Sequence, residues 1–397
     1  MIPELRKEFN ARFTERKYQL FQQRLTERCR AEIGFRICET PFFVPRHIQQ
    51  GCEEGAVELA MLAHDPDYLA ISDAALQPEH TVRNQTERAM FFVVDFAMAE
   101  GENGEIVPRL VEMQGFPSLM GFQLAFAELA QEHWELPDSL SYTNGGHTRQ
   151  QVVGLLHRAI VAQHDPENVV LLELDPWNQK TCCDFQIMRE LLGIHVADIR
   201  FVKKIGEKLH YEQDGRLVPI HRIFNRAIVD EIQKKGVTLP FNWYDELDVE
   251  WAGHPNWYFR ISKFTLPYLN HPLVPQSIFL DRVAELPANL DDFVLKPLYS
   301  FAGAGVIVGP TEAEVNGVPA EQRDKYILQK RITYAEAIAT PEGGTKAEYR
   351  IMLVWMPGEE RPRPIMGLVR MGRGRMMGVD FNRNMTWIGA GCNFYEA

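Results

Sequence analysis

The segment that most constrains the fold spans residues 89–114, where two apolar runs flank a turn. The runs read AMFFVVDFAMA and IVPRLVEMQ, and the residues between them read EGENGE. Apolar, β-branched and aromatic residues of this kind favour strands, and Asn103-Gly104 is a strong signal for a two-residue hairpin turn. We therefore expect an antiparallel hairpin, and a two-residue turn places Asp95 directly opposite Glu112.

This pairing brings two carboxylates face to face. Like charges opposed across a ladder destabilise it, and a bound cation would relieve the repulsion. Mg²⁺ prefers oxygen ligands, and Glu112 and Gln114 leave the same face of the strand because they are two residues apart. A solvated polar face is the alternative interpretation, and both stay open for Asp95, Glu112 and Gln114.

A second motif, FVLKPLYSFAGAG, combines a strand-like run, a lysine and a glycine loop. Backbone N–H groups in a loop without bulky side chains can reach a phosphate, and Lys296 adds a point charge. The alternative is a strand with an ordinary turn, because short glycine motifs have many chance matches. Taken together, the two motifs suit MgATP, since Mg²⁺ usually binds one or two carboxylates along with nucleotide phosphates.

The rest of the chain reads as a mixture of helices and strands. Residues 4–33 have the apolar periodicity of one helix, and residues 145–250 alternate strands with helices, which favours a partly parallel sheet. Residues 371–391 are rich in glycine, arginine and asparagine, which predicts a mobile loop that closes over the active site. This loop contains three arginines: Arg373, Arg375 and Arg383.

Composition restricts the class of protein further. The 397 residues are 45% hydrophobic and 24% charged, as in soluble globular proteins, and the net charge is −12. We expect no nucleic-acid partner, because such proteins usually carry a basic excess. Six irregularly spaced cysteines are typical of reduced thiols in a cytoplasmic protein. We find no signal-peptide core and no apolar run of about 18 residues, so we expect no membrane association.

Taken in order, the motifs resemble the circularly permuted ATP-grasp ligases, which include eukaryotic-type glutathione synthetase and glutathionylspermidine synthetase. LVEMQGFPSL resembles their metal strand, FVLKPLYSFAGAGV their lysine strand and glycine loop, and YILQKRI the strand that holds adenine. AEYRIMLVW, GLVRMG, RISKFTLPYL and PIHRIFNRAI are similar to further strands and segments of the nucleotide and substrate sites. The matches follow the family order from about residue 66 onward.

The resemblance implies an α/β (α+β) ATP-grasp fold, circularly permuted, with an inserted α/β substrate-binding domain. It divides the chain into an N-terminal helical segment (1–65), an ATP-grasp part with the metal hairpin (66–140), a substrate-binding domain (141–254) and a second ATP-grasp part (255–397). It implies that ATP contacts Lys263, Lys296, Ser300, Gly303, Gly305, Gln329, Lys330, Arg331, Ile332 and Glu348.

The resemblance also implies the remaining roles. Glu112 and Gln114 would hold Mg²⁺ with Asp95 nearby, and Arg370 would stabilise anionic oxygens during catalysis. The substrate would contact Arg226, Ser118 and Asp184. The partners implied are small-molecule substrates, and a homodimer is left open.

The sequence departs from the family pattern at the metal site. The glycine loop carries Ser300, Phe301 and Ala302 where the family commonly has a glutamate, and Gln114 replaces an asparagine. Two functional classes therefore stay open beside an unrelated α/β protein with chance motif matches. One is an ATP-dependent carboxylate–amine ligase that forms an acyl phosphate on a small amino acid, peptide or polyamine substrate. The other is a catalytically inactive nucleotide-binding protein.

Overall fold

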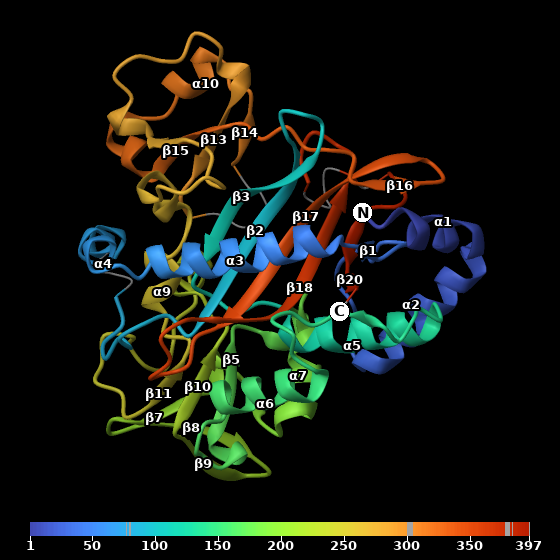
Figure 1. Ribbon diagram of the computed structural model, residues 1–397. Coiled ribbons are helices and arrows are strands. Elements are labelled where there is room, and N and C mark those ends of the chain that lie inside the picture. The colour runs from blue at the N-terminus through green and yellow to red at the C-terminus, as the bar shows by residue number, and fades with distance from the viewer. Residues whose placement is uncertain (77, 79–80, 300–304, 378–381, 383, 397) are drawn as a thin grey trace.

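The computed structural model describes residues 1–76, 78, 81–299, 305–377, 382 and 384–396. Within these residues the strands form five sheets, with helices packed around them, so the chain is an α+β protein. Figure 1 shows the largest sheet at the centre, a second sheet below it and a smaller one at the upper left.

The central sheet is antiparallel, in the order β19-β18-β17-β2-β3, and β16 pairs with β17. Its strands are β2 (Phe91–Glu100), β3 (Ile106–Gln114), β16 (Ile338–Thr340), β17 (Gly343–Val354), β18 (Arg363–Gly372) and β19 (Gly389–Gly391). Alternate residues of a strand face opposite sides. Phe92 and Val94 therefore pack in the core on the side of helix α3 (Arg46–Leu62), while Phe91 and Val93 join the other core. Burial on both faces explains why the β2 sequence is almost continuously apolar.

The β2–β3 hairpin confirms one expectation and corrects another. Residues 101–105 connect the strands, so the expected two-residue turn is wrong, although Gly104 does adopt a positive φ of 81°. Near the turn Phe96 pairs with Leu110, and the register then shifts by one residue so that Asp95 pairs with Glu112. The longer turn and this bulge offset each other, which is why the predicted pairing of the two carboxylates holds.

The lower sheet is parallel throughout, in the order β11-β10-β5-β6, as the alternation of strands and helices predicts. Its elements are β5 (Val169–Glu173), β6 (His195–Asp198), β10 (Arg222–Asn225), β11 (Glu250–Ala252), and the helices α6 (Arg149–Ile160) and α7 (Cys182–Leu192). The antiparallel strands β7 (Lys203–Ile205), β8 (Lys208–Gln213) and β9 (Arg216–Ile220) include the hairpin expected there. Two strands are shorter than expected: β6 ends before IRFV and β10 ends before RAI.

The third sheet runs in the order β12-β15-β13-β14 and is antiparallel. It consists of β12 (Ser277–Phe279), β13 (Phe293–Pro297), β14 (Ile307–Val308) and β15 (Tyr326–Lys330), with α10 (Glu312–Asn316) beside it. Its own small core contains Leu280, Leu295, Val315 and Leu328. The lysine strand of the sequence motif is β13, and the YILQKRI strand is β15.

The N-terminal residues form two helices rather than the single helix expected. They are α1 (Pro3–Arg12) and α2 (Glu15–Cys29). Thr14 has an extended backbone and caps α2, since its side chain accepts a hydrogen bond from the Lys17 N–H. A capping threonine therefore divides a segment whose apolar periodicity is otherwise continuous.

The remaining elements connect these layers. They are the helices α4 (Pro66–Ser72), α5 (Met120–His133), α8 (Val229–Lys234) and α9 (Asn256–Arg260), and the strands β1 (Phe42–Phe43), β4 (Leu140–Ser141) and β20 (Asn393–Glu396). Strand β20 lies between β1 and β4 and is parallel to β1. Among the described residues, no helix is both long and apolar enough to cross a membrane. All six cysteines are buried free thiols, as expected.

Residues 371–391, predicted to form a mobile loop, overlap the central sheet at both ends. Strand β18 continues through Gly372 and β19 begins at Gly389, so both ends of residues 371–391 belong to the central sheet. Arg373 donates to the hydroxyl oxygen of Thr345 at 3.0 Å, so this arginine is held against the sheet. Residues 378–381 and Arg383 lie outside the described residues.

Candidate functional site

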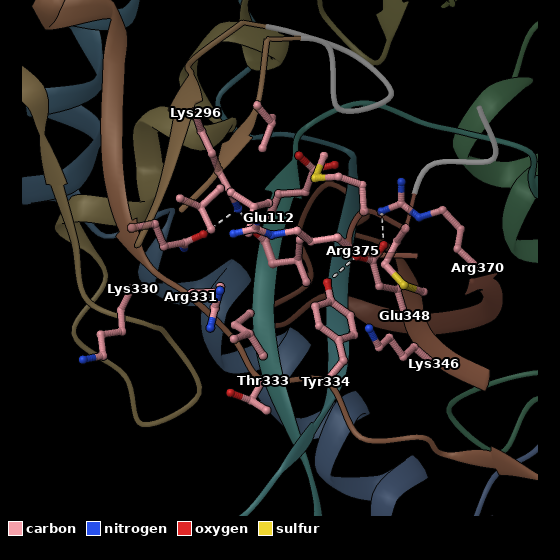
Figure 2. A pocket seen from close by; sticks show the side chains of 18 of the residues that line it. Glu112, Lys296, Lys330, Arg331, Thr333, Tyr334, Lys346, Glu348, Arg370 and Arg375 are labelled. Atoms are coloured by element: carbon pink, nitrogen blue, oxygen red, sulfur yellow. Dashed lines mark hydrogen bonds and ion pairs between the residues drawn. The ribbon is translucent and has the colours of Figure 1, made fainter. Parts of the chain in front are cut away.

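A cavity of about 320 Å³ lies between the central sheet and the third sheet. Its wall combines charged side chains with an apolar portion (Figure 2). The lining residues are Val111, Glu112, Lys263, Val294, Lys296, Val306, Val308, Gln329, Lys330, Arg331, Ile332, Thr333, Tyr334, Lys346, Glu348, Arg370, Arg375, Met376 and Met377. Nine of the residues predicted for ATP, metal or catalysis are thereby brought to one place.

Glu112 is the carboxylate at the centre of the charged part. Lys263 forms an ion pair with it at 3.2 Å, and the amide nitrogen of Gln114 donates to its other oxygen at 3.2 Å. Burial alone would raise the pKa of Glu112, but the nearby cations, above all Lys263 and Arg370, lower it to about 2. Glu112 is therefore ionised at neutral pH and surrounded by positive charge.

Asp95 lies behind the cavity wall and is held by two arginines. Arg350 pairs with Asp95 across β17 and β2 and contacts both of its oxygens, at 2.6 and 2.8 Å. Arg370 donates to one of the same oxygens at 2.5 Å. The repulsion between Asp95 and Glu112 that indicated a bound cation is thus relieved by side chains of the protein. Sequence reasoning missed Arg350, although it lies two residues from Glu348 and so faces the same side.

Arg370 also connects Asp95 to the cavity. Its Nη2 lies 2.9 Å from Glu348, which faces it across β17 and β18, and the Tyr334 hydroxyl donates to the other oxygen of Glu348 at 2.5 Å. Burial alone would lower the pKa of Arg370. The carboxylates of Glu348 and Asp95 outweigh this effect, so the pKa of Arg370 is raised. Figure 2 shows Tyr334, Glu348 and Arg370 together on one side of the cavity. Tyr334 was not predicted, because it follows β15 in a segment without strand periodicity.

Lys296 occupies the opposite side of the cavity, on β13. Its ammonium donates to the side-chain oxygen of Gln329 at 2.5 Å and to the Val111 carbonyl at 3.2 Å. Burial lowers the pKa of Lys296 to about 8, an effect that Glu112 partly opposes. Burial therefore favours the uncharged form of this lysine, and an anion bound beside it would favour the protonated form.

The glycine loop after β13 is described only in part. Gly305 has a φ of 72°, which favours glycine, and a Cβ there would lie 3.2 Å from a Pro297 ring carbon. Ser300 and Gly303 lie outside the described residues. Lys346 and Arg375, which were not among the predicted nucleotide ligands, add further positive charge to the lining.

The residues predicted to bind substrate lie apart from this cavity and near one another. Arg226 follows the end of β10, and its guanidinium lies over the rings of Phe116 and Phe185, at 5.1 and 5.6 Å. Asp184 accepts a hydrogen bond from the Phe122 N–H at 2.9 Å, at the start of α5. In the described part of the chain, the Nε and Nη1 of buried Arg226 have no hydrogen-bond partner.

A buried acid, Asp184, and a half-buried one, Glu173, accompany Arg226. Burial raises the pKa of Asp184, and the charge of Arg226 opposes that shift. Burial likewise raises the pKa of Glu173, at the end of β5, to about 7. Ser118, two residues after Phe116, is partly exposed. These groups gather at the carboxyl ends of parallel strands, where open α/β sheets commonly bind ligands.

A divalent cation would find few protein ligands in the cavity. No group of three or more His, Cys, Asp or Glu side chains suited to a metal ion occurs among the described residues. Glu112 and Gln114 nevertheless offer a carboxylate and an amide oxygen from one strand face. That donor set fits Mg²⁺, which usually takes one or two protein carboxylates and completes its shell with waters and phosphate oxygens.

Comparison with known proteins identifies a similar fold among the solved structures but no similar sequence. No protein-family model matches the sequence, and no curated protein matches it. Among solved structures, the chain is similar to a glutathione synthetase-like effector from Globodera pallida, determined in its apo form. The TM-score is 0.57 at 11% sequence identity, over 96% of this chain and 97% of that one. The protein therefore has a mixed α/β fold like that of a glutathione synthetase-like protein.

Proposed function

We propose that the protein is an ATP-dependent carboxylate–amine ligase with a circularly permuted ATP-grasp fold, acting on a small amino acid, peptide or polyamine. The observation that carries this proposal is the cavity between two sheets, in which Lys263, Lys296 and Arg370 surround the carboxylate of Glu112. A polyanion is the ligand that such a set of buried cations attracts. The glutathione synthetase-like fold of the structural neighbour supports the same class of protein.

In this proposal the triphosphate becomes a hydrogen-bonding partner of both lysines. Lys263 would leave Glu112 for a phosphate oxygen, and Lys296 would direct its free N–H to another. Glu112, released from its ion pair, and Gln114 would then hold Mg²⁺. Bound there, Mg²⁺ would neutralise phosphate charge and orient the γ-phosphoryl group, which is most of what phosphoryl transfer requires.

Arg370 is suited to the reacting carboxylate. The substrate carboxylate attacks the γ-phosphorus and ADP leaves, and the amine then attacks the acyl carbon and releases phosphate. Arg370 would donate hydrogen bonds to the oxygens on which negative charge develops. Its contacts with Asp95 and Glu348 fix its direction before substrate binds. The unpartnered nitrogens of Arg226 would receive an anionic group of the substrate.

A nucleotide-binding protein without catalysis is the second candidate. The observation that favours it is the metal site. Among the described residues that line the cavity, the acids are Glu112 and Glu348, and Glu348 is already paired with Arg370 and Tyr334. A single carboxylate and a neutral amide bind Mg²⁺ less strongly than two carboxylates do.

One experiment separates these candidates. The protein is incubated with MgATP and pooled amino acids, dipeptides and polyamines, while ADP release is measured and products are identified by mass spectrometry. ADP release that needs both an acid and an amine, with a condensed product, is expected. Nucleotide binding without turnover would favour the inactive candidate, and no nucleotide binding would refute both. Lys325→Ala is the matched control for Lys296→Ala, because Lys325 is exposed and does not line the cavity.

A further inference from the structure

A second cavity, of about 520 Å³, lies apart from the first one. Residues of α3, of the segment between α5 and α6, and of β20 line it, and Gln49 of α3 is one of them. The Tyr349 hydroxyl of β17 donates to the Gln49 oxygen at 2.5 Å, whereas Glu348, the neighbour of Tyr349, lines the first cavity. Successive residues of a strand face opposite sides of a sheet, so the two cavities lie on opposite faces of the central sheet. Figure 1 shows α3 across the face that carries the second cavity.

One face of α3 supplies charges of both signs to this cavity. Arg46, Gln49, Gln50 and Glu53 all line it, and their spacing of three, four and seven residues places them on one side of the helix. Arg46 begins the helix and Glu53 follows two turns later, so the two residues are about 10 Å apart along the helix axis. The wall therefore presents a cation and an anion at a spacing that the helix fixes.

The protein holds the Glu53 carboxylate through one oxygen. The Gln49 side-chain nitrogen and the Gly145 N–H both donate to Oε1, at 2.8 and 2.9 Å. Gln49 is 1% exposed, and because its oxygen accepts from Tyr349, its amide is fixed in this orientation.

The other oxygen of Glu53 faces a ligand instead. Among the residues that the structure describes, none donates a hydrogen bond to Oε2 and none forms an ion pair with Glu53. Glu53 is half-buried and lines the cavity, and Oε2 is not an enclosed atom. A carboxylate has room for about four hydrogen bonds, and partly buried acids are usually paired. An ammonium group in the cavity would complete the partners of Glu53.

The remaining wall suits a ligand with a carboxylate and amide groups. Arg149 lies in the wall with Arg46, and its pair with Glu128 at 2.9 Å is 34% and 43% exposed, so a ligand anion can replace that partner at little cost. Gln50, Gln131 and Ser139 add amide and hydroxyl groups. Such groups hydrogen-bond to peptide units and carry no charge of their own.

We propose that the second cavity binds a short peptide with free termini, with its ammonium group on Glu53 and its carboxylate on Arg46. An extended chain spans about 3.3–3.6 Å per residue, so charges about 10 Å apart match roughly three residues. The cavity volume lies within the range of about 300–1,000 Å³ that is usual for small-molecule sites. The inference uses no contact of the first cavity and does not depend on the proposed function.

The test is a ligand-observed NMR titration of the full-length protein, without nucleotide, using three peptides of one length. Triglycine has both charges, N-acetyl-triglycine lacks the ammonium group, and triglycinamide lacks the carboxylate. We expect each blocked peptide to bind on the order of tenfold more weakly than triglycine, because each loses a charge-assisted hydrogen bond.

Two substitutions assign these contacts to the cavity. Glu53→Gln, which keeps the shape, should reduce the affinity for triglycine to that for N-acetyl-triglycine, and Arg46→Gln should reduce it to that for triglycinamide. Glu54→Gln is the matched control, because Glu54 is exposed and does not line the cavity, and it should bind triglycine as the wild-type protein does.

Every other result would overturn the inference. Equal affinity of the wild-type protein for triglycine and N-acetyl-triglycine would exclude the ammonium contact, and this comparison needs no variant. Triglycine binding that is unchanged in Glu53→Gln would place the peptide elsewhere on the protein, and binding unchanged in Arg46→Gln would exclude the paired charges. Absence of saturable triglycine binding would remove the site altogether. None of these results bears on the first cavity, which ATP binding and ADP release test separately.

Discussion

Replacing Asp95 with asparagine removes a negative charge from the middle of the central sheet. The carboxylate is 1% exposed and accepts two hydrogen bonds from Arg350 and one from Arg370. Asparagine has nearly the same shape, but one of its two acceptor positions becomes an amide nitrogen that faces a guanidinium. Arg350 is buried too, so the substitution leaves a cation that water cannot reach.

The expected cost follows from that burial. Removing one partner of a buried ion pair destabilises proteins by about 3–5 kcal/mol, while exposed pairs contribute about 0–1 kcal/mol. Because Arg370 keeps its contact with Glu348, only the Arg350 side of the network loses its full partner. We therefore expect Asp95→Asn to lower the free energy of unfolding by about 3 kcal/mol, at the lower end of the range for buried pairs.

Urea denaturation measures this change directly. Glu100→Gln is the matched control, because it neutralises an exposed acid at the end of the same strand and should change stability by less than about 0.5 kcal/mol. A double variant, Asp95→Asn with Arg350→Met, should recover part of the loss, since it removes the isolated charge. A destabilisation below about 1 kcal/mol for Asp95→Asn would refute the reasoning that this network is a buried structural pair.

Four further outcomes concern the cavity. Lys296→Ala should weaken ATP binding strongly with little change in melting temperature, and calorimetry showing unchanged affinity would exclude a phosphate contact. Glu112→Gln should abolish MgATP-dependent turnover while keeping the fold, and normal turnover at limiting Mg²⁺ would contradict the proposed metal ligand. Because the pKa of Lys296 is about 8 and phosphate favours its protonated form, ATP affinity should hold below that pH and fall above it, and Lys296→Met should lose this dependence. Amide hydrogen exchange in residues 371–391 should slow when MgATP and substrate bind, and strong protection in the free protein would count against a lid.

Local sequence patterns were sufficient for the parts of the site that lie within one strand or one hairpin. Glu112 and Gln114 share a face because strands have a period of two, and Lys296 lies on β13 just before its end, as the motif indicates. The positions of Asp95 and Glu112 also follow from one hairpin, although two features of that hairpin, the longer turn and the bulge, were not visible in the sequence.

Contacts between distant strands could not be predicted in the same way. Arg350 reaches Asp95 only because β17 pairs with β2 in one particular register, and nothing in either strand alone specifies that register. The same limit applies to Tyr334, whose role depends on how the segment after β15 meets β17. The break at Thr14 is different, since threonine is a recognised N-cap and the signal was present within a periodic stretch.

The position of β20 between β1 and β4 has a consequence for the order of folding. Strand β1 forms near the start of the sequence, but its parallel partner is made only when residues 393–396 have been synthesised. Until then the backbone of Phe42 and Phe43 lacks the strand with which it pairs in the folded protein. Contacts between segments so far apart form slowly, because a long loop must close first. During synthesis this layer should therefore stay incomplete until residues 393–396 have left the ribosome.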